Sequence, residues 1–247
     1  MRAPVDHIAA PEFPVRLPWF NSEALGMKEL QGRPVLLEFW DCCRANSIRT
    51  LPYMRAWHER YGPHGLEVIG VHTAGFEVSS DPAVVERAVA RLQITYPVVV
   101  DTELEIWERY GTVGWPARYL CDHRGMVFEH HLGEGDYGET ERAIQELLGL
   151  DMPVLDPVRP EDAPGAPLEP QSQDRDDPPY GGPYTAGGVW GVLEGSGTVT
   201  VNGAALAVPD TGCYELISHP RSTTADLALE LSDGLRCHAV CFTPGLA

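Results

Sequence analysis

The chain has 247 residues, of which 43% are hydrophobic and 22% are charged, and 36 acidic side chains outnumber 18 basic ones. This length suits one large domain or two modest ones, and either can bury a hydrophobic core. A formal net charge of −18 argues against nucleic acid and against an anionic membrane surface as partners, because both are bound through basic side chains. No stretch approaches the roughly 20 consecutive apolar residues of a membrane-spanning helix.

The N-terminal residues and the cysteine content bear on the cellular compartment. Residues 1–14 contain charges and prolines but lack the apolar core of a signal peptide. Six cysteines in a chain of this length do not make a disulfide-dense composition, so we expect most of them to be free thiols. The sequence therefore predicts a cytoplasmic protein.

The first 150 residues alternate strand and helix patterns. In chain order they predict strands at 35–40, 66–72 and 96–100, helices at 47–61, 81–92 and 103–110, a hairpin of strands 117–121 and 125–130, and a last helix at 140–148. The continuous apolar run at 35–40 is typical of a parallel strand buried on both faces. Asp81 and Pro82 form a typical helix start. This order predicts an α/β domain whose last two strands are antiparallel.

The composition changes at residue 151. Residues 151–183 are rich in proline, glycine and acidic side chains, and such a segment buries too little apolar surface to offset its ordering entropy. We expect a linker there, or an extended strand wrapped over the surface. After it, short strand patterns alternate with turn signals such as Asn202-Gly203 and Asp233-Gly234. We therefore expect an α/β domain at 1–150, a Pro-rich acidic linker at 151–183 and a small antiparallel all-β domain at 184–247.

Several fragments of the first 150 residues follow a familiar order. They are Ala10–Phe13, Leu36–Asp41, Ile48–Tyr53, Val68–His72, Tyr96–Val98, Trp115–Ala117 and Gly133–Gly135. On these fragments the chain resembles the thioredoxin-like superfamily, and within it the AhpC/TSA and TlpA-like redoxin domains of DipZ-type thiol–disulfide proteins. The resemblance implies a thioredoxin-like fold and thiol-based redox chemistry. It also implies that Glu38 is the acidic residue of the central strand and that Pro116 is the cis proline beside the reactive sulfur.

The chain departs from this family at the Cys-x-x-Cys motif. In register, the two motif cysteines fall on Arg44 and Ser47. The motif works because the helix N-terminus lowers the pKa of the first thiol and the second thiol resolves the mixed disulfide. Arg44 cannot attack a disulfide and Ser47 cannot resolve one, so ordinary thioredoxin turnover through these positions is excluded.

Cys42 and Cys43 stand just before the first motif position, and three interpretations of them are open. They can be inert packing residues of a degenerate domain. One of them can be a relocated nucleophile, whose thiolate the Arg44 charge and the helix dipole would stabilise. As a vicinal pair they can bind a soft metal or metalloid. A disulfide between adjacent cysteines closes a strained ring and would be easily reduced.

Other residues complete the predicted site. Glu38, if buried beneath the helix start, would have a raised pKa suited to proton transfer. Trp40, Trp115 and Pro116 are expected to line a substrate cleft. The histidines and the C-terminal cysteines do not have the spacing of a metal site, so we predict no cofactor and no metal there.

The function predicted from the sequence is thiol redox chemistry at Cys42 and Cys43, acting on a small-molecule or protein thiol or disulfide. A homodimer is compatible with the exposed strand edges expected of the β domain. The peroxiredoxin signature is missing, because Val35 and Leu36 stand seven residues before the two cysteines. The alternative is a non-catalytic module that binds a ligand, a peptide or a soft metal, with the β domain as a partner surface.

Overall fold

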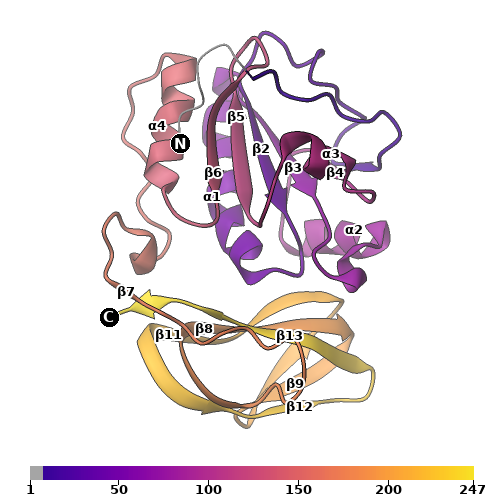
Figure 1. Ribbon diagram of the computed structural model, residues 1–247, viewed down its shortest axis with the longest axis vertical. Helices are drawn as coiled ribbons and strands as arrows, with labels where there is room; N and C mark the ends of the chain where they lie inside the picture. Colours follow the sequence, from indigo (N-terminus) through magenta and orange to yellow (C-terminus); the bar gives the residue numbers. More distant parts are fainter. Residues whose placement is uncertain (1–7) are drawn as a thin grey trace. The chain divides into compact units, whose positions relative to one another are not determined.

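The computed structural model describes residues 8–247, which divide into two compact units. The first unit comprises the chain up to Cys42 together with Asn46–Val158. The second comprises Cys43–Ala45 and Arg159–Ala247. The α/β pattern lies in the first unit and the all-β pattern lies in the second, as Figure 1 shows by colour.

The first unit is built on one mixed sheet. Its elements are β1 (Trp19–Phe20), β2 (Val35–Trp40), α1 (Ala45–Tyr61), β3 (Glu67–His72), α2 (Pro82–Arg91), β4 (Val98–Val100), α3 (Glu105–Tyr110), β5 (Ala117–Cys121), β6 (Val127–Leu132) and α4 (Tyr137–Leu148). The strand order is β1-β4-β3-β2-β5-β6. Strand β2 pairs in parallel with β3, while β5 pairs antiparallel with both β2 and β6. The antiparallel pairing predicted for the last two strands is confirmed.

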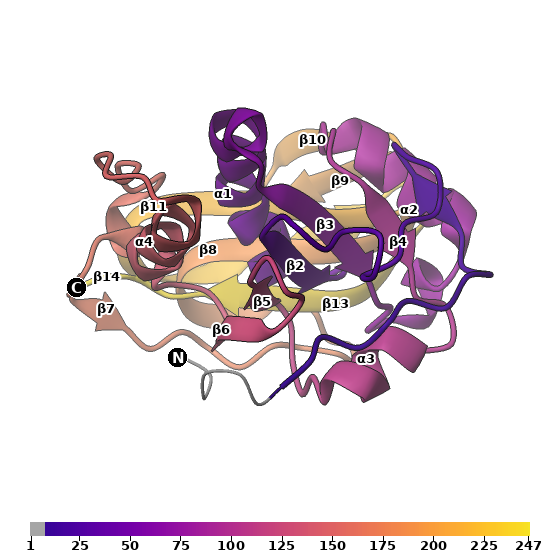
Figure 2. The same ribbon diagram turned by 90° about the horizontal axis from the view of Figure 1, so that it is seen from above.

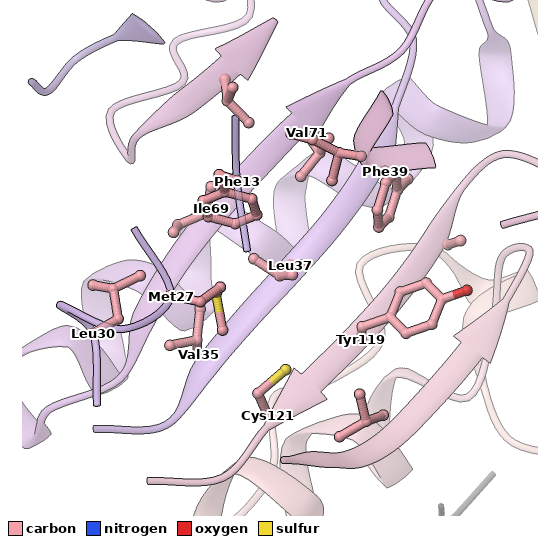
Figure 3. Close-up of a cluster of buried hydrophobic side chains, with 14 of the residues drawn as sticks. Phe13, Met27, Leu30, Val35, Leu37, Phe39, Ile69, Val71, Tyr119 and Cys121 are labelled. Carbon is pink, nitrogen blue, oxygen red and sulfur yellow. The ribbon is translucent and has the colours of Figure 1, made fainter. Parts of the chain in front are cut away.

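The two faces of β2 carry different side chains because successive residues point to opposite sides of a sheet. Val35, Leu37 and Phe39 belong to an apolar cluster that also contains side chains of the N-terminal segment (Figure 3). The Phe39 ring lies against Trp107 and Tyr110 of α3, with ring centroids 6.1 and 5.4 Å apart. This face of the sheet is therefore covered by α3 and the N-terminal segment.

Helices α1 and α4 lie together on the other side, and Figure 2 shows α1 and α3 on opposite sides of the sheet. Tyr53 of α1 stacks on Tyr137 of α4 with ring centroids 3.7 Å apart. Helix α2 lies beside α1, because Arg55 of α1 donates a hydrogen bond to the Leu92 carbonyl at the end of α2. The cap predicted for α2 is confirmed, since the Asp81 carboxylate accepts a hydrogen bond from the Ala83 amide.

The second unit is antiparallel throughout its described pairings, which confirms the predicted β domain. Its strands are β7 (Leu168–Glu169), β8 (Gly182–Gly195), β9 (Gly197–Val201), β10 (Ala204–Val208), β11 (Gly212–Leu227), β12 (Leu229–Leu231), β13 (Leu235–Thr243) and β14 (Gly245–Leu246). They form the orders β10-β9-β12, β11-β8-β13 and β14-β7. A core of aliphatic and aromatic side chains, including Tyr184, Leu193 and Phe242, is buried between them.

The segment 151–183 is held by hydrogen bonds along much of its length. The Met152 and Leu155 amides donate to the Gln145 and Glu141 side chains of α4, at 2.9 and 2.8 Å. Further on, β7 pairs with β14, and Arg175 forms a bridge with Val240 of β13. The beginning of this segment therefore packs within the first unit and its remainder within the second.

Candidate functional site

Cys42 and Cys43 lie between the last residue of β2 and the first residue of α1. A strand that ends just before a helix begins is where the resemblance places the reactive sulfur. Both side chains are buried, and neither sulfur is in a disulfide. The other four cysteines of the described residues are not in disulfides either.

Asp41 places a carboxylate beside the two sulfurs. One ligand atom from each of Asp41, Cys42 and Cys43 lies within 4.8 Å of the other two, and all three residues are buried. The Asp41 side chain accepts a hydrogen bond from the Gly75 amide at 2.8 Å. The Asp41 amide in turn donates to the Ser47 hydroxyl at 3.2 Å. These bonds hold the carboxylate in place.

His72 borders the same cluster. The parallel register of β2 and β3 sets Trp40 opposite His72, so the residues that follow Trp40 lie next to the imidazole. His72 Nε2 accepts a hydrogen bond from the Cys42 amide at 3.3 Å and lies 3.6 Å from Asp41 Oδ1. Sequence reasoning missed Asp41 and His72, although the adjoining cysteines and the shared end of two parallel strands were available as signals.

The two positions of the lost motif lie at the start of α1 and just before it. Ser47 is fully buried and serves as the acceptor for Asp41, whereas Arg44 is half-buried. Arg49, on the next turn of α1, is buried and forms an ion pair with Glu134, with Nε and Oε2 2.8 Å apart. The Arg49 charge is therefore engaged by a carboxylate.

Glu38 occupies the position beneath the helix start that the resemblance implied. It is fully buried, and neither of its carboxylate oxygens has a hydrogen-bond partner among the described residues. Burial raises the pKa of Glu38 to about 8, and the positive charge of Arg118 opposes part of that rise. Arg118 lies directly across from Glu38 in the β2–β5 pairing and is itself 1% exposed.

Arg118 was not anticipated as part of the site. Its guanidinium donates from Nη2 to the Gly135 carbonyl at 2.6 Å and lies over the Tyr137 ring, 4.8 Å from its centroid. A charged residue inside an otherwise apolar strand was the available signal. The pairing with Glu38 depends on the register of two strands, and the two paired residues are 80 positions apart in the sequence.

The loop before β5 approaches the helix start. The Trp115–Pro116 peptide bond is cis, and the Asn46 side chain of α1 donates to the Trp115 carbonyl at 3.4 Å. The Trp115 ring donates from Nε1 to the Thr73 hydroxyl at 2.8 Å and is half-buried. Trp40 is 0% exposed, with its ring against that of His72. The structure thus brings Trp115 and Pro116 to the helix start and places Trp40 in the interior.

This sheet order, with the cis proline beside the start of α1, defines the class of thioredoxin-like folds. Solved structures agree. A thioredoxin-like superfamily protein, SPOA0173, superposes with a TM-score of 0.54 at 24% identity, covering 60% of this chain and 100% of that one. A thiol-disulfide isomerase from Corynebacterium glutamicum gives 0.52 at 22% identity, covering 57% and 98%. The thioredoxin-like fold implied by the resemblance is confirmed.

The profile of the AhpC/TSA family matches residues 9–130. The match identifies these residues as an AhpC/TSA redoxin domain. Protein DipZ of Mycobacterium tuberculosis is 37% identical over 133 residues, which are 53% of this chain and 19% of DipZ. The thiol-disulfide oxidoreductase ResA of Halalkalibacterium halodurans is 29% identical over 54% of this chain and 70% of ResA. The chain thus spans about a fifth of the length of DipZ.

The relatives confirm the resemblance to the thioredoxin-fold thiol–disulfide oxidoreductases. This chain differs from the pattern of that family because it lacks the Cys-x-x-Cys motif. Across residues 8–247, none of the helices combines the length and the apolar character needed to cross a bilayer.

Proposed function

We propose that this redoxin domain performs thiol-based redox chemistry through the vicinal pair Cys42–Cys43 in place of Cys-x-x-Cys. The observation that supports it is the location of two adjacent cysteines, neither of them in a disulfide, between the end of β2 and the start of α1. Two thiols are the minimum needed to reduce a disulfide without a second protein. The substrate class is a small-molecule or protein disulfide. Cysteines that are not in disulfides fit a reducing compartment such as the cytoplasm.

The chemistry proceeds by two exchanges. The thiolate of one cysteine attacks a substrate sulfur, the substrate S–S bond breaks, and the departing sulfur takes up a proton. The neighbouring thiol then gives up its proton and attacks the mixed disulfide, which releases the second substrate thiol and closes a Cys42–Cys43 disulfide. The substrate gains two electrons and the pair loses two. Because the vicinal ring is strained, the oxidised pair would pass its oxidation on readily.

Neighbouring residues have roles in this proposal. Glu38, with a pKa of about 8, exchanges its proton close to neutral pH and would relay protons to and from the thiols. Arg44 follows Cys43 directly and would place a positive charge next to the attacking sulfur. Trp115 and Pro116, at the helix start, would contact the substrate. Trp40 is buried and would act indirectly, because its ring packs against the His72 ring and would hold it in position.

Separate replacement of the two cysteines tests the redox function. Cys42→Ser and Cys43→Ser would each lower the single-turnover reduction of oxidised glutathione by the pre-reduced protein at least tenfold, because either loss prevents ring closure. Cys121→Ser, in the apolar core of the same unit, is the matched control. Site-resolved alkylation against pH, read by mass spectrometry, would show which thiol attacks. Wild-type turnover in both variants, with native circular dichroism, would refute the proposal.

A second candidate is the non-catalytic binding module. It is favoured by the Asp41 carboxylate within 4.8 Å of both sulfurs, because this grouping offers the donor atoms of a binding site. The burial of both thiols points the same way. If the wild-type protein turns over no disulfide and neither thiol reacts faster than an ordinary one, the module is the better description.

A further inference from the structure

We infer that Asp41, Cys42 and Cys43 form a binding site for a thiophilic divalent cation of the zinc class. The inference goes beyond the proposed redox function and does not require it. Its basis is a convergence of three donors of the right chemistry, all buried, from three consecutive residues. Buried donors suit a tightly held ion that is shielded from solvent.

The distances are compatible with one shared ion. Zinc binds thiolate sulfur at about 2.3 Å and carboxylate oxygen at about 2.0 Å, so tetrahedral ligand atoms lie about 3.3–3.8 Å apart. The donors from Asp41, Cys42 and Cys43 lie within 4.8 Å of one another. A closure of about 1 Å, within the reach of side-chain torsions, would complete the set. The two cysteines are adjacent, so their approach needs no rearrangement of distant segments.

The donor types select the ion. Two thiolates are soft ligands that favour zinc and its heavier congeners, whereas magnesium and calcium prefer oxygen alone. Once both thiols have lost their protons to a bound ion, the two thiolates and the carboxylate together carry a charge of −3, which suits a cation rather than a neutral ligand. A divalent ion would neutralise most of that charge and would deprotonate both thiols on binding.

The surroundings hold the carboxylate as metal ligands are usually held. Asp41 accepts the Gly75 amide at 2.8 Å, and its own amide is fixed to Ser47. Partners of this kind orient a ligand and typically contribute 10- to 100-fold in metal affinity. His72 Nε2 accepts a hydrogen bond from the Cys42 amide, so its lone pair is already engaged and three protein ligands remain for the ion.

Metal binding and vicinal oxidation exclude each other. Both thiolate ligands are consumed when Cys42 and Cys43 form a disulfide, so an occupied site would protect the pair from oxidation. Reduction would restore the site. The ion and the disulfide are therefore alternative states of the same two sulfurs.

The test is a titration of the reduced, chelator-treated full chain. Cd²⁺ would be followed by its ultraviolet thiolate charge-transfer absorption, and Zn²⁺ by competition with a chromophoric chelator, with Mg²⁺ as the hard-cation control. We expect one Cd²⁺ or Zn²⁺ per chain, no response to Mg²⁺, and an affinity that rises with pH because the thiols must lose protons. Cys42→Ser and Cys43→Ser would each weaken binding by at least about tenfold.

Further variants keep the test decisive if a cysteine variant fails to fold. Asp41→Asn retains both thiols and the side-chain shape, and it would weaken Zn²⁺ binding by about tenfold. Cys121→Ser and Cys213→Ser are buried-thiol controls that would bind as the wild type does. Absence of stoichiometric binding, or equal binding by Asp41→Asn and both cysteine variants, would overturn the inference. Glutathione turnover measured on the metal-free protein separates this outcome from failure of the redox proposal.

Discussion

At the scale of single residues, the most unusual feature is a carboxyl group without a hydrogen-bond partner in the interior. Glu38 is fully buried, its oxygens have no bonding partner among the described residues, and its pKa is raised to about 8. Desolvation is the larger cause, and the Arg118 charge offsets only part of it. Because such a group costs free energy when ionised, its presence fits the proton-relay role proposed for it above.

Replacement of Glu38 by glutamine should change how stability depends on pH. The unfolded carboxyl has an ordinary pKa near 4.5 and the folded one about 8, so the folded state binds the proton more tightly. The resulting penalty is absent below the lower value, grows as the pH rises between the two, and is complete above the higher one. It would amount to on the order of 5 kcal/mol.

Urea unfolding of the wild type and Glu38→Gln between about pH 5 and about pH 9 would measure this penalty. The wild type should lose stability as the pH rises, and the variant should lose much less. Glu86→Gln, at an exposed position of α2, is the control and should follow the wild type. Parallel profiles for the wild type and Glu38→Gln would show that Glu38 does not titrate in this range.

The thiols away from the site should be inert. Burial raises the pKa of Cys121 to about 12, mainly by desolvation. At pH 8 its thiolate fraction would be on the order of a thousandfold below that of an unfolded cysteine. Timed iodoacetamide labelling with peptide mass spectrometry should show slow modification of Cys121 in the native protein and rapid modification in denaturant. Equal labelling rates in the two states would contradict this.

At the scale of elements, the β2–β5 pairing determines the surroundings of Glu38. Arg118 reaches it only because the antiparallel register sets the two residues opposite each other. Arg118→Met would remove the charge that lowers the pKa of Glu38, and the Glu38 titration should move to higher pH. Carboxyl-carbon NMR of Glu-labelled protein would follow it. Arg142→Met, exposed on α4, should leave the titration in place, and an unchanged Glu38 midpoint in Arg118→Met would disprove the coupling.

In the second unit, a glycine allows two segments to approach closely. A Cβ on Gly187 would lie 2.4 Å from the Pro244 carbonyl oxygen and 2.5 Å from the Gly245 Cα, both of them backbone atoms. Gly187→Ala should therefore destabilise the β domain by about 2 kcal/mol or more. Gly114→Ala, where a Cβ would meet no atom within 4 Å, is the control. Thermal unfolding of both variants measures the difference, and equal midpoints would argue against the tight approach.

Gly187 also lies in a region where the sequence patterns did not predict the full extent of a strand. The α/β elements followed from apolar periodicity, and the structure reproduces their order. Strand β8 begins at Gly182 and runs through Gly187 and Gly188, which lack the side chains that signal a strand. Strand β11 extends from Gly212 to Leu227 despite Pro220, with register shifts along its pairing with β8.

For the site, the local part was predictable and the distant part was not. The position of Cys42 and Cys43 after β2 follows from strand and helix patterns alone. His72 and Arg118 join the site through the registers of β3 and β5 with β2, which no local pattern specifies. The raised pKa of Glu38 is caused by its burial, and that burial became evident only from the fold.

At the scale of the whole molecule, the two units and the segment that joins them determine where the chain can be divided. The composition changes at residue 151, but the hydrogen bonds of the first unit continue beyond it. The Arg60 guanidinium donates to the Pro153 carbonyl at 2.7 Å, and the Val158 amide donates to the Tyr53 hydroxyl at 2.8 Å. The first unit accordingly extends to Val158 in the structure.

This extension predicts that a fragment ending at 158 is more stable than one ending at 150. The shorter fragment would lose four hydrogen bonds, made by Met152, Pro153, Leu155 and Val158, and would leave Glu141 and Gln145 of α4 less well satisfied. At about 0.5–1.5 kcal/mol for each bond, the difference should be about 2–4 kcal/mol after partial compensation by water. Urea unfolding of the two fragments measures it, and Tyr53→Phe in the longer fragment should remove only the share that depends on Val158. Equal midpoints for the two fragments would show that residues 151–158 behave as a linker, as the composition alone suggested.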